Sequence, residues 1–302
     1  MAPGSLRAFF SHWLANTIGV ARHHPHSELS TPKNIIEKAR SGTQAIERAL
    51  LLLRVVASAG RRGMRVAEIT AAAALSQATV SRMLASLMRE GVVERDERTR
   101  KYFIGHLIHE LGLVARARYT LSEASRSAMQ RLAEDSQDTV YLSEPSGTEA
   151  VCTAREEGGY PIKALPLHVG IRRPLGVGAG GLAILAAMNP ATAEEIMRAN
   201  AGRYPAYGGI DIAYLEEAVA AARKRGWALA DRATSGMTAI GVSILGDSAE
   251  PLGAISIAAI SPRMTPERQV ELARLLRAQC AATGAALAGR AQDATHSARR
   301  RA

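Results

Sequence analysis

The sequence predicts an α+β protein with two folded units: a three-helix unit ending in a β-hairpin, and a larger unit of antiparallel strands flanked by helices. The length of 302 residues suits about two domains. Hydrophobic residues make up 47% of the chain, which is enough for two packed cores. Charge divides the chain unevenly, since Lys and Arg outnumber Asp and Glu by 18 to 9 up to residue 120 and by only 20 to 19 beyond it.

Nearly all of the net charge of +10 therefore lies in the first unit, which is typical of a polyanion-binding module joined to a neutral one. An aromatic content of 4% disfavours a stacking platform for single strands. Two cysteines, Cys152 and Cys280, exclude a disulfide scaffold and suit a reducing, cytoplasmic location. No stretch of about 18 apolar residues occurs, so no membrane span is expected.

Both ends of the chain are expected to lie outside the folded units. Residues 1–40 are interpreted as a disordered extension, although residues 6–20 also fit a weak targeting helix. The histidines around Pro25 are interpreted as solvated side chains rather than metal ligands. Residues 290–302 end in a run of arginines and are interpreted as a flexible basic tail.

The first unit, residues 41–105, begins with three predicted helices. Apolar residues recur at helical spacing from Ile46 to Ala57, and Gly60 is expected to end that first helix. A short second helix is predicted over Val66–Ala73. The third helix, residues 77–90, follows a good N-cap residue.

One face of the third helix is polar and basic, and it holds no acidic residue before Glu90. That face carries Gln77, Ala78, Thr79, Ser81, Arg82, Ser86 and Arg89, and Ser76 is the cap. A helix that needs only solubility usually mixes both signs of charge. Base edges and phosphates, in contrast, are read at close range by small polar and cationic groups. The pattern therefore favours a DNA recognition helix.

Two short strands, Val92–Asp96 and Lys101–Gly105, are predicted to form a hairpin with a charged tip. Arg98, Arg100 and Lys101 lie on or beside this tip, where they can neutralise phosphates. An ordinary three-helix domain whose hairpin binds protein is the alternative. The order of the elements and the acid-free helix face favour a winged helix-turn-helix that binds duplex DNA.

Residues 106–120 are predicted to form an amphipathic linker helix, with packing on its own domain as the alternative. The second unit, residues 121–289, alternates strand-like runs and helices around an antiparallel sheet. The predicted strands are Thr139–Ser143, Ala150–Ala154, Ile162–Leu165, Trp227–Ala230, Ala239–Leu245 and Leu252–Ala259. The predicted helices are Ser122–Ser136, Gly180–Met188, Thr192–Asn200, Ile212–Arg225 and Thr265–Ala288.

Several segments resemble the IclR family of bacterial transcriptional regulators, and together they span residues 41–289. The segments are Gln44–Leu50, Val66–Ile69, Leu75–Leu84, Leu87–Gly91, Gly226–Asp231, Gly236–Ile240 and Ala254–Ala258. The resemblance implies a winged helix-turn-helix, a linker helix that helps dimerisation and a GAF-like effector domain. Ala74 departs from the family, which often has glycine in this turn, and we expect Ala74 in a right-handed turn.

The resemblance implies a ligand-responsive transcription regulator that binds a palindromic operator as a homo-oligomer, either a dimer or a tetramer. The expected DNA contacts are Ser76, Gln77, Ala78, Thr79, Ser81, Arg82, Arg98, Arg100 and Lys101. A metabolite-binding enzyme and a non-specific architectural DNA binder are the alternatives. The enzyme would turn over a substrate. The architectural protein would bind DNA of any sequence and would not respond to a ligand.

A glycine-rich segment, residues 176–181, matches the dinucleotide fingerprint, but it does not follow a buried strand, so that interpretation is rejected. Main-chain N–H groups running into a helix do favour an anion such as a carboxylate. The resemblance implies an effector site at this turn, with Gly178 and Ala179 as main-chain contacts. Tight helix–sheet packing by small residues is the alternative.

The resemblance also implies that Asp231, Ala239, Ser256 and Ala258 lie at or near the effector pocket. Ala239 and Ala258 stand where relatives can carry Cys and Ser, which predicts a less hydroxyl-rich ligand, such as a carboxylate with an apolar or aromatic body. Asp231 is equally compatible with a surface loop acid.

No arrangement in the sequence indicates an enzyme. Cys152 lies in a strand-like run, where a lone cysteine is most often a small buried hydrophobe. His168, between Leu167 and Val169, is interpreted as a packed or capping histidine. Neither paired carboxylates nor metal-ligand spacing stands out. We therefore expect no catalytic residue, no metal and no cofactor.

Overall fold

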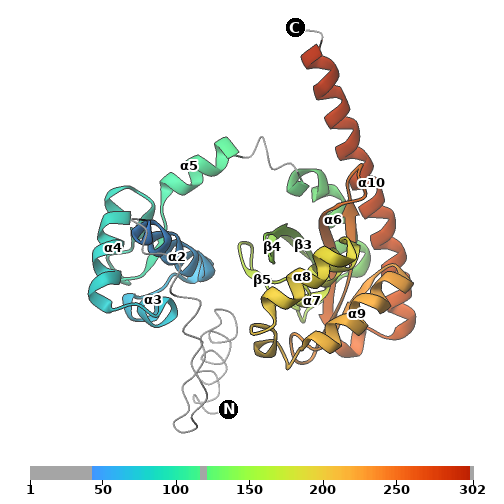
Figure 1. Ribbon diagram of the computed structural model, residues 1–302, viewed down its shortest axis with the longest axis horizontal. Coiled ribbons are helices and arrows are strands. Elements are labelled where there is room, and N and C mark those ends of the chain that lie inside the picture. Colours follow the sequence, from blue (N-terminus) through green and yellow to red (C-terminus); the bar gives the residue numbers. More distant parts are fainter. Residues whose placement is uncertain (1–42, 116–120, 300–302) are drawn as a thin grey trace. The chain divides into compact units, whose positions relative to one another are not determined.

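The computed structural model describes residues 43–115 and 121–299, with side chains up to residue 289. The chain divides into two units, residues 1–118 and 119–302, which are described separately (Figure 1). The predicted extension at residues 1–40 lies outside the described residues, as does the end of the predicted linker at residues 116–120. Within the described ranges, no helix is long and apolar enough to cross a bilayer.

The first unit consists of three helices, a two-stranded hairpin and a further helix. Its elements are α2 (Gln44–Ser58), α3 (Val66–Ala73), α4 (Gln77–Arg89), β1 (Val93–Arg95), β2 (Tyr102–Ile104) and α5 (His106–Ala115). One core holds α2, α3, α4 and the hairpin together, with Leu52, Ile69 and Leu84 completely buried in it. No residue of α5 is buried, and Leu111 and Val114 are 54% and 79% exposed.

The turn between α3 and α4 differs from our expectation. Ala74 has φ 52° and ψ 37°, which is the left-handed helical region, so the expected right-handed turn is wrong. The chain must reverse sharply here so that α4 can start at once from Ser76. A β-carbon in this conformation costs roughly 1–2 kcal/mol, and a glycine would avoid that cost.

The second unit contains a six-stranded antiparallel sheet in the order β5-β4-β3-β8-β7-β6. The strands are β3 (Thr139–Ser146), β4 (Glu149–Glu157), β5 (Arg172–Pro174), β6 (Ala228–Ala230), β7 (Met237–Leu245) and β8 (Pro251–Ile260). The helices are α6 (Leu121–Ser136), α7 (Gly178–Ala187), α8 (Pro190–Asn200), α9 (Ile212–Arg225) and α10 (Pro266–Arg299).

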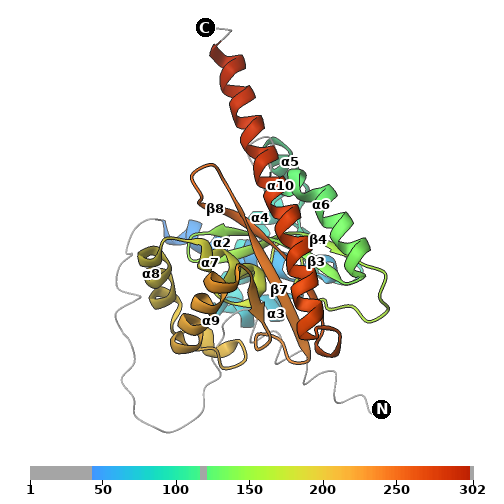
Figure 2. The same cartoon turned by 90° about the vertical axis from the view of Figure 1, so that its right-hand side faces the viewer.

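Helices cover both faces of this sheet. Helices α6 and α10 pack together on one face (Figure 2), against Val140, Ile240 and Ile257. On the other face, α7, α8 and α9 enclose a second core around Leu182 and Leu215. Alternating side chains of β3, β7 and β8 therefore enter different layers, which accounts for the strand patterns in the sequence.

Two predicted boundaries of the second unit are wrong. Residues 162–165 form no strand. The edge strand that pairs with β4 is β5 instead, and in it Arg173 lies opposite Ala150. Ile162 is 56% exposed, so this apolar run is not one of the buried strands that it resembles. Helix α10 continues to Arg299 instead of ending at Ala288, because no proline follows Gly289 and most of the intervening residues favour helices.

Candidate functional site

The first candidate site is the outward face of α4. The side chain of Ser76 caps this helix, because its Oγ accepts a hydrogen bond from the backbone N–H of Thr79 at 3.3 Å. The hydroxyl groups of the two residues also lie 2.8 Å apart. Val80 and Leu84 are completely buried, so they fix which face of the helix points into the core. The polar face predicted from the sequence points outward as a result.

Gln77, Ala78, Ser81 and Arg82 are all exposed on that face, and Thr79 is half-buried beside its cap. We call the outward residues 77–82 of α4 the reading surface. The first turn of the helix contains no acidic residue. Within the described part of the chain, Arg82 has no ion-pair or hydrogen-bond partner. Its guanidinium is therefore available to an external anion or base edge.

The hairpin tip, residues 96–101, is shaped by Asp96. The carboxylate of Asp96 accepts hydrogen bonds from the backbone N–H and the hydroxyl of Thr99, at 2.6 and 2.7 Å. These bonds lower the pKa of Asp96 below its ordinary value. The N–H of Arg100 donates to the carbonyl of Asp96 at 2.8 Å, and Arg100 takes a positive φ of 59°. A closed turn thus presents the basic side chains of the tip.

The three basic residues of this tip have different surroundings. Arg98 is exposed and has no ion-pair partner among the described residues. Arg100 lies 3.9 Å from Glu97, which competes with any external anion. The ammonium group of Lys101 donates to the carbonyl of Arg62 at 2.9 Å and so attaches the hairpin to the end of α2 and its following turn. Arg98 is the most available of the three for a phosphate.

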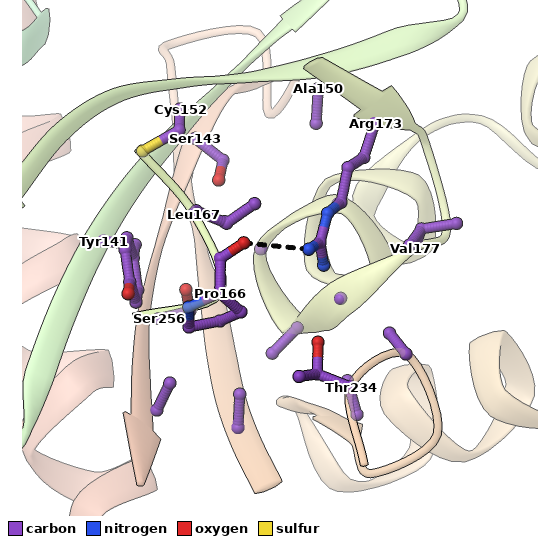
Figure 3. Close-up of a pocket in the computed structure, with 18 of the residues that line it drawn as sticks. Tyr141, Ser143, Ala150, Cys152, Pro166, Leu167, Arg173, Val177, Thr234 and Ser256 are labelled. Carbon is purple, nitrogen blue, oxygen red and sulfur yellow. Dashed lines mark hydrogen bonds between the residues drawn. The ribbon is translucent and has the colours of Figure 1, made fainter. Parts of the chain in front are cut away.

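The second candidate site is a cavity in the second unit, between the start of α7 and the inner face of the sheet (Figure 3). It encloses about 640 Å³ of space, part of which is open to solvent. Its wall is mostly apolar, with contributions from Leu167, Met237, Ala239 and Ala258. No acidic residue of the described chain lines the cavity.

Arg173 is the charged residue that lines the cavity. Its guanidinium donates to the carbonyl of Pro166 at 3.0 Å (Figure 3). It also lies 5.8 Å from the ring centre of Tyr207. No carboxylate pairs with it among the described residues, although its neighbour Arg172 pairs with Glu149 at 2.6 Å. Burial lowers the pKa of Arg173, which nevertheless keeps its charge. A cation without a counter-ion in a cavity is an anion-binding group.

The start of α7 supplies a second group of donors. The first N–H groups of a helix have no hydrogen-bond partner within the helix. In α7 no N-cap side chain accepts a hydrogen bond from them either. Ser143 and Ser256 lie beneath it and are each 5% exposed. A β-carbon on Gly180 would lie 2.7 Å from the Ser143 hydroxyl and 3.6 Å from that of Ser256. Glycine is therefore needed here for close packing, while Gly178 borders open space.

Five of the six predicted effector residues line this cavity: Gly178, Ala179, Ala239, Ser256 and Ala258. Asp231 does not. Strand β6 ends at Ala230, which does line the cavity, and successive side chains point to opposite sides. Asp231 is exposed, and its negative charge adds to burial in raising the pKa of Tyr214. The structure thus places it as a surface loop acid.

Sequence reasoning missed Arg173. Its strand has only three residues and reads Arg-Arg-Pro, which shows no apolar alternation. Only the pairing of Ala150 with Arg173 reveals that this arginine, and not Arg172, faces the cavity. Ala150, which lies opposite Arg173, offered a hint in the sequence, because a small residue leaves room for a long side chain beside it.

Cys152 has the surroundings of a buried structural thiol and not of an activated nucleophile. The Cys152 thiol contacts the carbonyl of Ala154 at 3.6 Å, and burial raises its pKa to about 12, so it is not a thiolate at neutral pH. The Nδ1 atom of His168 lies 3.3 Å from the guanidinium of Arg155. Burial and that positive charge lower the pKa of His168.

Comparison with known proteins assigns both units to one family. The family model described as "Bacterial transcriptional regulator IclR C-terminal" matches residues 115–283. The model described as "IclR helix-turn-helix domain" matches residues 45–97. The HTH-type transcriptional regulator BhcR of Paracoccus denitrificans is 28% identical over 229 residues, which cover 75% of this chain and 81% of that protein.

Solved structures agree. A crystal structure of an IclR-type regulator from Silicibacter sp. TM1040 is 26% identical, covers 82% of this chain and 95% of its own, and gives a TM-score of 0.64. An IclR homologue from Microbacterium hydrocarbonoxydans, solved with 4-hydroxybenzoate, is 22% identical and also gives a TM-score of 0.64. It covers 80% of this chain and 98% of that one, and at this identity the likeness concerns the fold.

Proposed function

The chain belongs to the IclR family of bacterial transcriptional regulators, and we propose that it reads operator DNA through α4 under the control of a small organic acid held in the cavity. The relatives it resembles are named as a transcriptional regulator and a transcriptional repressor. The observation that carries the choice of ligand is Arg173, a cation that faces a cavity without an acidic lining residue.

The reading surface is proposed to enter the major groove. Gln77, Thr79 and Ser81 offer short polar groups, and Arg82 offers the paired donors that suit guanine. Ser76 and Ala78 flank them at the start of the helix. The hairpin tip would contact phosphate, chiefly through Arg98, with Arg100 and Lys101 beside it.

We infer that two copies bind together on a palindromic operator, because two-fold symmetry doubles a small contact surface. Exposed apolar side chains on α2 and α5 support a homo-oligomer: Ile46 is 61% exposed and Val114 is 79% exposed. Its site of action is then the cytoplasm, where bacterial DNA lies. The ligand would change operator affinity only if it binds one arrangement of the copies better than another.

The DNA half of the proposal is tested by titrating the region upstream of the protein's own gene with the full chain. Changing Arg82→Ala should weaken specific binding by about 1–3 kcal/mol, because one bidentate base contact is lost. Arg126→Ala, which removes an exposed arginine from α6 in the second unit, is the matched control. Equal operator affinity of the Arg82 variant and the wild type would exclude the assignment of α4.

The ligand half is tested by calorimetry of the full chain with a panel of small organic acids, 4-hydroxybenzoate included. Arg173→Gln should weaken binding of any responding acid by about 1.5–3 kcal/mol, the range for a hydrogen bond to a charged group. Arg172→Gln, one residue away but paired with Glu149, should not. Silence of the wild type across the panel, or equal loss in both variants, would refute the proposed site.

The same experiments separate the alternative functions. An architectural DNA binder would bind scrambled and upstream duplexes equally and would not respond to any acid. A metabolite-binding enzyme would consume the acid during the titration, which chromatography of the mixture would detect. A regulator of the proposed kind binds the upstream duplex selectively and returns the acid unchanged.

A further inference from the structure

We propose that the turn between α2 and α3 is a second phosphate-binding surface, which holds the DNA backbone beside the hairpin tip through Arg61 and Arg65. We call residues 60–65 the basic turn; their sequence is Gly-Arg-Arg-Gly-Met-Arg. This inference rests on the proposed function, because it adds contacts to the same DNA complex. The contacts come from a segment outside both the reading surface and the hairpin tip.

The basic turn is fixed to the hairpin. The N–H of Met64 donates to the carbonyl of Tyr102 at 3.1 Å, and the N–H of Tyr102 donates to the carbonyl of Met64 at 2.7 Å. The side chain of Met64 is completely buried in the core of the first unit. The ammonium group of Lys101 donates to the carbonyl of Arg62 at 2.9 Å. The basic turn and the hairpin tip therefore belong to one packed surface.

The strand register brings the charges of the two segments together. Met64 and Tyr102 form an antiparallel bridge, so Arg65, which follows Met64, lies level with Lys101, which precedes Tyr102. Neighbouring strands are roughly 5 Å apart, and the phosphates of one DNA strand are about 3.4 Å apart along the helix axis. A DNA strand that crosses both segments therefore meets Arg65 within a few phosphates of the tip.

Most of the charge on this surface is not neutralised. Arg61 and Arg65 are exposed, and neither forms an ion pair among the described residues. Arg62 differs, because Glu68 lies 3.8 Å from its guanidinium. The basic turn and the hairpin tip together hold six of the eleven Lys and Arg residues between positions 43 and 105. Such a concentration of cations attracts a polyanion.

The chemistry of the basic turn fits phosphates and not base edges. Its polar side chains are long cations without the short polar groups of the reading surface, such as Gln77 and Ser81. Backbone contacts position a protein on DNA but carry no sequence information. The basic turn should therefore raise the affinity for every duplex by the same factor, whereas Arg82 of the reading surface should discriminate between duplexes.

The test is fluorescence anisotropy of the full chain on the upstream duplex and on a scrambled duplex, from about 50 to about 200 mM salt. Arg61→Gln and Arg65→Gln should each reduce the slope of log affinity against log salt by about 0.9, the value for one lost phosphate contact. Each should weaken both duplexes equally, by about threefold or more in low salt. Arg126→Gln, which changes the net charge equally on exposed α6, should keep the wild-type slope.

A second substitution predicts a gain of affinity. Glu68→Gln removes the charge beside Arg62 but keeps a side-chain oxygen that can accept the N–H of Arg65, which lies 2.7 Å from Glu68 Oε2. It should tighten binding to both duplexes several-fold in low salt, because Arg62 becomes available to phosphate. Glu216→Gln removes an exposed acid of α9 and should not change the affinity.

The outcomes separate this inference from the proposed function. Wild-type salt slopes in both arginine variants, with Arg82→Ala still weakening the upstream duplex, would refute the basic turn and leave the proposed function intact. An equal reduction of the slope in Arg126→Gln would refute it as well, since overall charge would then explain the effect. If the wild type binds neither duplex, both the inference and the proposed function are wrong.

Discussion

The two units treat their arginines in opposite ways. On the reading surface and hairpin tip of the first unit, Arg82 and Arg98 are exposed and unpaired among the described residues. In the second unit, Glu149 and Asp138 each bind two arginines inside the fold, and Arg173 is the cavity cation that is left over. Under the proposed function, Arg82, Arg98 and Arg173 are cations that meet external anions: phosphate at an exposed, salt-screened surface, and carboxylate in the cavity.

The strongest way to break this comparison is to remove a paired anion. Asp138 has a side chain that is 2% exposed, and it contacts Arg263 at 3.0 Å and Arg268 at 2.9 Å. Asp138→Asn should lower the free energy of unfolding of the second unit by about 3 kcal/mol, because two partly buried cations lose their partner. Urea denaturation followed by circular dichroism would measure this.

Arg173→Gln is the control for that measurement. It removes a cation that has no carboxylate partner, so it should leave the free energy of unfolding unchanged or slightly raised. If both substitutions destabilise the protein equally, Arg173 is part of the structural framework, and the distinction between paired and unpaired arginines fails.

A smaller effect is expected in the turn before the reading surface. Ala74→Gly should stabilise the first unit by about 1 kcal/mol, because glycine adopts the left-handed conformation without a steric cost. Ala71→Gly, at an exposed position within α3, is the matched control and should destabilise it by a similar amount. Thermal unfolding of the two single variants should give a higher melting temperature for Ala74→Gly and a lower one for Ala71→Gly. A lower melting temperature in both would contradict the assigned turn.

The smallest expected effect is a pH dependence carried by Glu149. Burial raises the pKa of this carboxyl, but hydrogen bonds from Arg172 and Arg203 outweigh it and hold the pKa below the ordinary value of 4.5. The ion pairs should therefore stabilise the second unit fully above pH 4.5 and less as the pH falls below it. In urea titrations between pH 6 and pH 3, the free energy of unfolding of Glu149→Gln should fall less with decreasing pH than that of the wild type. The same pH dependence in both proteins would contradict this role of Glu149.

The sequence predicts local features best where one residue decides them. Ser76 fixes the start of α4, and buried Val80 and Leu84 fix its outward face, so the helix and its polar surface could be inferred directly. The IclR fold and a regulatory, non-enzymatic function are likewise confirmed by the family matches. The contacts assigned to individual DNA- and ligand-binding residues remain predictions.

Features that depend on distant pairing could not be predicted. Arg173 becomes a cavity residue only through its position opposite Ala150. Residues 162–165 resemble a strand in sequence because they are mostly apolar, but no strand pairs with them. The turn at Ala74 is set by the packing of two helices, which overrides the preference of alanine for right-handed conformations. The sequence left Asp231 open between the pocket and the surface, because it directly follows β6, whose last residue, Ala230, lines the cavity.

The most direct test of the central claim joins the two units in one measurement. Fluorescence anisotropy would follow the full chain on labelled upstream DNA, with and without the acid that binds best, for the wild type and for Arg173→Gln. We predict that the acid changes operator affinity of the wild type and leaves that of the variant unchanged, while both bind DNA equally without it. The same response to acid in both proteins, or no response in either, would contradict the account.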